Sequence, residues 1–199
     1  MSAHVHDHER SAAISARVKG LIARLEQRRL TSEAELDSTI ERFLLNAKVQ
    51  NGYRIVARAW RDPGFRERLL FDANDAVAEL GVDLSYWAPV RLRVVENTPK
   101  THNMIVCTLC SCYPIALLGP SPSWYKSEAY RARAVRDPRS VLEEFGVTLP
   151  AETAITVWDS TAEARYMVLP MRPPGTERLS ESDLASLVTR DGLIGTALV

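Results

Sequence analysis

The sequence predicts an α/β protein of the α+β kind, with a helical N-terminal arm followed by a mixed α/β domain. Through the first third, apolar residues recur at three- and four-residue steps, the period of an amphipathic helix. After Gly81, short β-branched runs replace that pattern and indicate strands. All three cysteines lie between Cys107 and Cys112, directly after one of these runs. We therefore expect a helical segment over residues 1–90 and an α/β domain that contains the cysteines over residues 91–199.

The composition is that of an ordinary globular protein. The 199 residues include 25 Lys+Arg and 25 Asp+Glu, so no basic field is available for nucleic acid. No apolar run approaches the roughly 18 residues of a membrane-spanning helix. Three cysteines are too few for a secreted disulfide framework. We expect no nucleic-acid partner, no membrane segment and a cytoplasmic location.

Three helices are predicted in the first third. Residues 11–30 carry an apolar stripe opposite Arg and Glu, which favours one amphipathic helix. Ser32 and Glu35 form a capping box that begins a second helix, which ends near Asn46. Asp62 as N-cap, Pro63 at the first helical position and a glycine at 81 predict a third helix over residues 63–80.

Strands are predicted at residues 92–96 and 104–106, and again at 155–158 and 165–169 with a turn between them. The Pro-, Gly- and Ser-rich stretch 114–123 is not expected to form regular structure. Asp137 and Pro138 begin a short helix that Gly146 ends. Ser180 and Asp183 cap a final helix.

The segment 106–112, with the sequence VCTLCSC, is chemically unusual. Three clustered cysteines beside Ser111 would make an odd apolar core. A thioredoxin-like pair should begin a helix, and a structural zinc site needs four ligands, commonly as two separated pairs that this chain lacks. His102 could at best supply a fourth ligand, and we expect it instead at the surface or behind the ligands.

A metal ion held almost entirely by this segment is the remaining interpretation. Cys110 and Cys112 can approach one centre only if the backbone between them wraps around it, which brings the peptide nitrogens of Ser111 and Cys112 to bonding distance. Cys107 can reach over one face as an axial thiolate. Soft, anionic donors select against Mg²⁺ and Ca²⁺ and favour a low-spin trivalent iron or cobalt ion with Lewis acidity. We therefore predict a metal claw where a strand exits into a loop, in a site for hydration or hydrolysis.

Two other clusters are interpreted structurally. The aromatic residues Trp124 and Tyr125, with Lys126, are expected to pack the loop after the cysteines more than to border a pocket. A run of four arginines at helical spacing would suggest phosphate binding if considered alone, but acidic residues beside it predict an ion-pair face. These are Arg131, Arg133, Arg136 and Arg139.

The sequence resembles the metal-binding alpha subunit of nitrile hydratase. Besides the cysteine segment, the resemblance rests on residues 124–127, 130–133, 136–139, 158–160, 165–166, 169–170, 172–173, 175–176, 188–191 and 193–195. It covers most of the chain from about Val56 onward. Thr108 and Tyr113 are similar to the cobalt-type members, so the resemblance favours cobalt over iron.

The resemblance implies a role for each residue of the claw. Cys107 would be the unmodified axial thiolate, Cys110 the sulfinate and Cys112 the sulfenate, with backbone nitrogens from Ser111 and Cys112. Oxidation is chemically plausible because a thiolate is the first species of the oxidation ladder. Cys110, Ser111 and Cys112 would then be the catalytic group around one Co³⁺ ion. The implied reaction is nitrile plus water to amide, with the Cys112 sulfenate oxygen, an activated water or a metal-bound hydroxide as alternative nucleophiles.

The resemblance also implies partners. A beta subunit, in one or two chains, would supply arginines to the oxidised cysteines, and an activator protein would deliver cobalt. We expect the isolated chain to be nearly inactive and to cover its partner surface by forming a homodimer.

Tyr113 and Ile115 are the candidate pocket residues. Family members often carry tryptophan where Ile115 stands, so a wider pocket and a bulky heteroaromatic, even nucleoside-like, nitrile are predicted. The metal subunit of thiocyanate hydrolase is the alternative enzyme. A metal-carrying assembly intermediate without activity of its own is the alternative outside enzymes.

Overall fold

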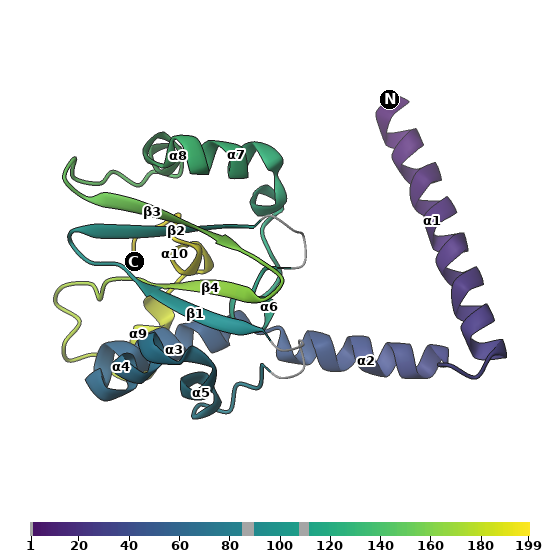
Figure 1. Ribbon diagram of the computed structural model, residues 1–199, viewed down its shortest axis with the longest axis horizontal. Coiled ribbons are helices and arrows are strands. Elements are labelled where there is room, and N and C mark those ends of the chain that lie inside the picture. The colour runs from purple at the N-terminus through teal and green to yellow at the C-terminus, as the bar shows by residue number, and fades with distance from the viewer. Residues whose placement is uncertain (1, 85–89, 108–111) are drawn as a thin grey trace. The chain divides into compact units, whose positions relative to one another are not determined.

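The computed structural model describes residues 2–84, 90–107 and 112–199, in two units, Met1–Asn46 and Ala47–Val199 (Figure 1). The boundary lies after Asn46 and not near residue 90, because the helices that follow it pack against one another and against the first strand. Among the described residues, no helix is both long and apolar enough to cross a membrane.

The first unit consists of helices α1 (Ser2–Gln27) and α2 (Glu33–Asn46). α1 begins earlier than the predicted residue 11. The capping box before α2 is confirmed, since Glu35 N donates to Ser32 Oγ at 3.2 Å and Ser32 N donates to the Glu35 carboxylate at 2.9 Å. The stripe predicted in α1 is about half exposed at Ile14 and Leu21.

Helix α3 (Val49–Arg61) begins the second unit and was not predicted. Its N-cap residue, Lys48, makes no side-chain capping bond, so the sequence gives no start signal there. The helix nevertheless buries Ile55 and Val56 completely. Tertiary packing, and not a cap, defines this helix.

The single helix predicted over residues 63–80 is wrong. The structure has α4 (Pro63–Phe71) and α5 (Ala73–Ala78), separated by Asp72. Asp72 is extended, with φ −136°, and its carboxylate accepts hydrogen bonds from the first backbone N–H groups of α5. The predicted cap of α4 is confirmed, since Asp62 accepts from Phe65 N at 2.9 Å.

Four strands form two parallel pairs. β1 (Arg91–Glu96) pairs with β4 (Ala164–Leu169), and β2 (Thr101–Cys107) pairs with β3 (Ala154–Ser160). All four predicted strands are therefore confirmed, although β2 and β3 are each seven residues long and extend well beyond the predicted bounds. β2 and β4 lie in contact at the centre, so the four strands follow the order β3, β2, β4, β1 across the molecule (Figure 1).

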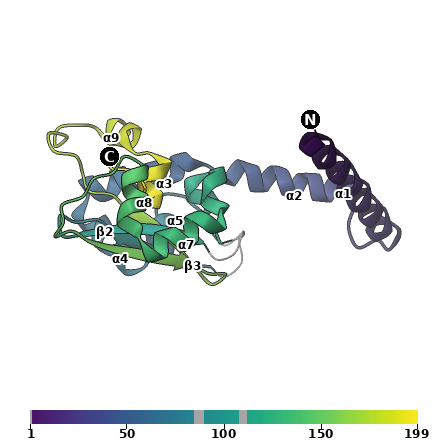
Figure 2. The same ribbon diagram turned by 90° about the horizontal axis from the view of Figure 1, so that it is seen from above.

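Helices surround these strands. α7 (Glu128–Arg136) contacts β2 and α8 (Pro138–Glu144) contacts β3, whereas α4 and α5 contact β1. α3 and α9 (Glu181–Leu187) pack against each other to one side of the strands (Figure 2). The predicted caps of α8 and α9 are confirmed, but α9 is not the final helix, because Thr189 caps α10 (Arg190–Ile194).

The stretch 114–123 is more regular than predicted. It contains α6 (Ile115–Leu118), and the 3₁₀ helix η2 (Ser123–Lys126) begins at its end. α6 lies tightly against α3: Asn51 Nδ2 donates to Ala116 O at 2.9 Å, and a Cβ on Gly52 would lie 2.5 Å from Leu117 O. This close contact holds the chain in place just after the cysteines.

His102 lies in the core near the start of β2 and not at the surface, with 3% of its area exposed. Its Nε2 lies 2.8 Å from Gly195 O, a group that only accepts, so Nε2 carries the proton. Nδ1 then accepts from the Asn97 amide at 3.3 Å. Burial lowers the His102 pKa, because the charged imidazolium would lose its hydration.

This burial predicts acid-sensitive folding of the full chain. The folded His102 pKa lies below the unfolded value, so the stabilisation is complete above about pH 6.5 and falls as the pH drops towards the folded pKa. We expect the urea midpoint to fall between about pH 7.5 and about pH 5.5 in the wild type, and to fall less in His102→Gln. The same loss of midpoint in both proteins would contradict this assignment.

Candidate metal centre

Two of the three cysteines, Cys107 and Cys112, lie within the described residues, and Cys107 is at the exit of β2. Cys107 is the last residue of that strand and is half-buried, and Cys112 is fully buried. Residues 108–111, which include the predicted donors Cys110 and Ser111, lie outside the described residues.

The core determines where the chain leaves the strand. Met104, Ile105 and Val106 are at most 1% exposed, and Cys107 is the next residue and the first to reach a cavity. On the far side of the segment, Tyr113 is 5% exposed and is followed by α6. The described residues that precede and follow 108–111 are therefore held by packing.

The donor chemistry fits a transition metal. Two thiols border a four-residue segment that contains the third cysteine, and soft sulfur donors select such ions over Mg²⁺ or Ca²⁺. His102 does not join them, since it lies near the opposite end of β2 and its ring is already hydrogen-bonded. Within the part of the chain that the structure describes, no three or more His, Cys, Asp and Glu residues are grouped so that they could hold a metal ion.

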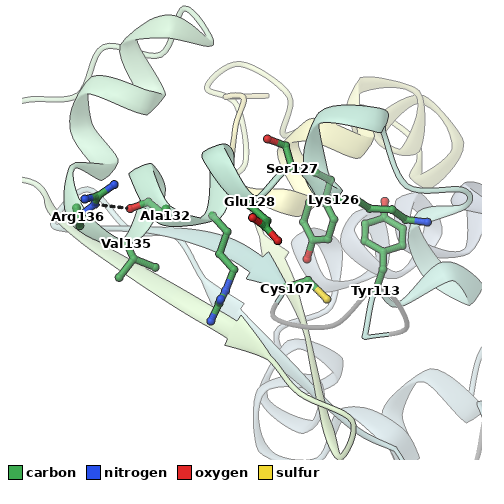
Figure 3. Close-up of a pocket in the computed structure, with 10 residues that line it drawn as sticks. Cys107, Tyr113, Lys126, Ser127, Glu128, Ala132, Val135 and Arg136 are labelled. Carbon is green, nitrogen blue, oxygen red and sulfur yellow. Dashed lines mark hydrogen bonds between the residues drawn. The ribbon is translucent and has the colours of Figure 1, made fainter. Parts of the chain in front are cut away.

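A cavity of about 600 Å³ lies beside Cys107. Figure 3 shows Cys107 and Tyr113 at one end of it and Val135 and Arg136 at the other. The remaining lining residues are Tyr125, Lys126, Ser127, Glu128, Arg131 and Ala132. The candidate pocket residue Tyr113 thus lines this cavity, whereas Ile115 is half-buried in α6 and is not among the described lining residues.

Phenol groups form the inner wall. Tyr113 and Tyr125 pack edge to face with ring centroids 4.9 Å apart. Burial raises the pKa of both phenols well above 10, so each keeps its proton at neutral pH. Tyr113 donates a long hydrogen bond of 3.4 Å to Leu118 O. The wall is therefore uncharged.

The aromatic residues after the cysteines pack the loop, as predicted. Trp124 contacts Tyr130 and Phe145 with ring centroids 4.9 Å and 4.7 Å away. Tyr125 and Lys126 also line the cavity, so the two roles coexist.

The predicted ion-pair face is confirmed for two of the four arginines of the run, Arg131 and Arg133. Arg131 bonds Asp159 at 2.8 Å and Arg133 bonds Glu144, which ties α7 to β3 and to α8. Arg139 donates instead to the backbone oxygens of Leu149 and Thr153, at 3.1 and 2.7 Å. These contacts hold the outer wall of the cavity in place.

Comparison with known proteins gives consistent results. Residues 12–197 match the family model described as nitrile hydratase, alpha chain. The low-molecular weight cobalt-containing nitrile hydratase subunit alpha of Rhodococcus rhodochrous is 52% identical over 185 residues, which cover 93% of this chain and 88% of that protein. Thiocyanate hydrolase subunit gamma of Thiobacillus thioparus is 46% identical over 154 residues, covering 73% of this chain and 63% of that protein.

The fold also matches solved structures. A double mutant of the Fe-type nitrile hydratase from Comamonas testosteroni Ni1 superposes with a TM-score of 0.84 at 42% identity, covering 94% of this chain and 90% of that one.

Proposed function

This chain belongs to the nitrile hydratase alpha-chain family, and from that premise we propose that it is the subunit that holds the metal ion of a nitrile hydratase. The observation that carries the proposal is the position of the cysteine segment. Cys107 ends β2 at the cavity, and Cys112 is buried on the other side of the segment. A ligand bound at the claw would therefore face a preformed space.

The claw residues are proposed in the roles that the sequence predicts. Cys107 binds as the unmodified thiolate, Cys110 and Cys112 as sulfinate and sulfenate, and Ser111 and Cys112 supply backbone nitrogen. When bound, the metal ion supplies Lewis acidity that polarises a nitrile or a water molecule. Cys110, Ser111 and Cys112 form the catalytic group.

The rest of the chain shapes the space around that group. The rings of Tyr113 and Tyr125 offer an apolar wall to the organic part of a nitrile. Lys126 and Glu128 place opposite charges on the more exposed side of the same cavity. Arg131 and Arg136 line the same cavity, so its described lining residues include three cations and one carboxylate.

Cobalt is the proposed metal, as Co³⁺ with one ion per chain. Thr108 and Tyr113 support this choice, and so does the cobalt named in the relative from Rhodococcus. The Fe-type neighbour shows that the fold itself does not select between the two ions.

The proposed assembly is hetero-oligomeric, as the relatives' names describe subunits. A beta subunit in one or two copies would supply arginines to the oxidised cysteines, because an anionic sulfinate in a closed site needs charge-assisted hydrogen bonds. A cobalt-delivering activator, a homodimer of the isolated chain and a cytoplasmic location remain predictions.

Thiocyanate hydrolase is the second candidate. The specific observation in its favour is the 46% identity to a subunit of that enzyme. Hydrolysis of thiocyanate by the purified complex, without hydration of nitriles, would favour it. Metal binding without turnover of either substrate would favour the assembly intermediate.

The metal assignment predicts the behaviour of cysteine variants in the complex with the beta subunit. We expect about one cobalt per alpha chain in the wild type, measured by elemental analysis. Cys110→Ala and Cys112→Ala should each lose both cobalt and nitrile hydration, because each removes a donor and its chelate ring. The exposed Ser123, changed to Ala, is the matched control and should keep both. Tetrahedral zinc in an active complex would contradict the proposal.

The predicted substrate size is tested at Ile115. If its smaller side chain widens the pocket, Ile115→Trp should lower kcat/KM for a heteroaromatic nitrile relative to acrylonitrile by more than about threefold. The readout is the ratio of the two kcat/KM values in each complex. A ratio unchanged within about threefold would show that Ile115 does not set substrate size.

A further inference from the structure

Two buried hydroxyls beside Cys107 have no hydrogen-bond partner within the described structure. They belong to Tyr125, which is 2% exposed, and to Ser160, which is 0% exposed. A buried hydroxyl without a partner loses its hydrogen bonds to water and forms no hydrogen bond in the protein to replace them. Two such groups at one place indicate a missing acceptor.

The elements that carry Tyr125 and Ser160 both adjoin Cys107. Ser160 is paired with Cys107 in the parallel register of β2 and β3, so the two side chains leave the same face of the strands. The 3₁₀ helix that carries Tyr125 packs against β2, and Tyr125 lines the cavity together with Cys107.

The electrostatics agree with this placement. Burial raises the pKa of Tyr125, and the charge of Cys107 adds to that shift, while the Ser160 hydroxyl acts in the opposite direction. Tyr125 and Ser160 thus lie close enough to influence each other without reaching hydrogen-bond geometry.

We propose that the Tyr125 and Ser160 hydroxyls donate hydrogen bonds to Cys107 Sγ when this sulfur is a metal-bound thiolate. The inference rests on the proposed metal-binding function. A neutral thiol is a weak acceptor, whereas a thiolate is anionic and accepts strongly from O–H groups. Metal binding, which requires the thiolate, would therefore satisfy both hydroxyls at once.

Tyr125 and Ser160 are then positioning residues for a metal ligand. Hydrogen bonds to a ligating sulfur fix its orientation and withdraw electron density from it, which tunes the metal. Withdrawal of electron density lowers the energy of the filled sulfur orbitals. The sulfur-to-metal charge-transfer absorption therefore moves to higher energy. Loss of either hydrogen bond should move that absorption to longer wavelength.

A neighbouring tyrosine provides a matched control. Tyr130 is also buried in this aromatic cluster, but its hydroxyl already donates to Ile105 O at 3.0 Å. Tyr130→Phe removes a hydroxyl of the same kind that has no role at the sulfur.

The experiment compares Tyr125→Phe, Ser160→Ala, the double variant and Tyr130→Phe as purified cobalt-loaded complexes. We expect the sulfur-to-cobalt absorption band to shift to longer wavelength in both single variants and further in the double variant, at unchanged cobalt content. Tyr130→Phe should leave the band in place and lower the thermal midpoint. The cobalt-free Tyr125→Phe chain should be at least as stable as the wild type, because it loses only an unsatisfied hydroxyl.

A band that stays in place in both fully loaded single variants would overturn the inference while leaving the metal site intact. Wild-type complex without cobalt or iron would instead overturn the proposed function, and the inference with it. If Ser160→Ala does not accumulate, Tyr125→Phe alone decides, because it preserves the ring that packs on Tyr113.

Discussion

The parallel pairing of β2 with β3 determines where the chain leaves the core, and the proposed metal centre depends on that point. Three fully packed residues of β2 precede Cys107, and the pairing of Cys107 with Ser160 closes the ladder. A shift of one residue in the strand would turn the cysteine to the opposite face. The strand register therefore places Cys107 at the cavity, which the cysteine spacing alone does not predict.

The surroundings of this exit are built from contacts of different strength. The inner wall is aromatic and buried, with Tyr113 and Tyr125 in edge contact. The outer wall is held by the Arg131–Asp159 pair, which is roughly two-fifths exposed and so contributes little stability by itself. The cavity therefore has one buried aromatic wall and one wall that is held by a more exposed ion pair.

Local signals made much of this structure predictable. Asp62 and Ser180 each cap a helix by accepting a hydrogen bond from the backbone N–H three residues later, so the sequence alone marks these helix starts. The cysteine motif is likewise recognisable because its residues are contiguous in the sequence. Features that depend on contacts between distant segments could not be predicted from local sequence. α3 has no side-chain cap, and β1 pairs with β4, which is about 70 residues later in the sequence. The burial of His102 and the proximity of Tyr125 to Ser160 likewise depend on segments that are far apart in the sequence.

The central claim is that one metal ion is held by the segment that follows β2, and cobalt K-edge X-ray absorption of the purified complex tests it most directly. The account predicts a shell of three sulfur and two nitrogen donors, with a sixth, light-atom ligand. It also predicts that the sulfur contribution falls by about one third in Cys107→Ser, if that variant retains cobalt. A first shell of only nitrogen and oxygen, or one unchanged by that substitution, would contradict it.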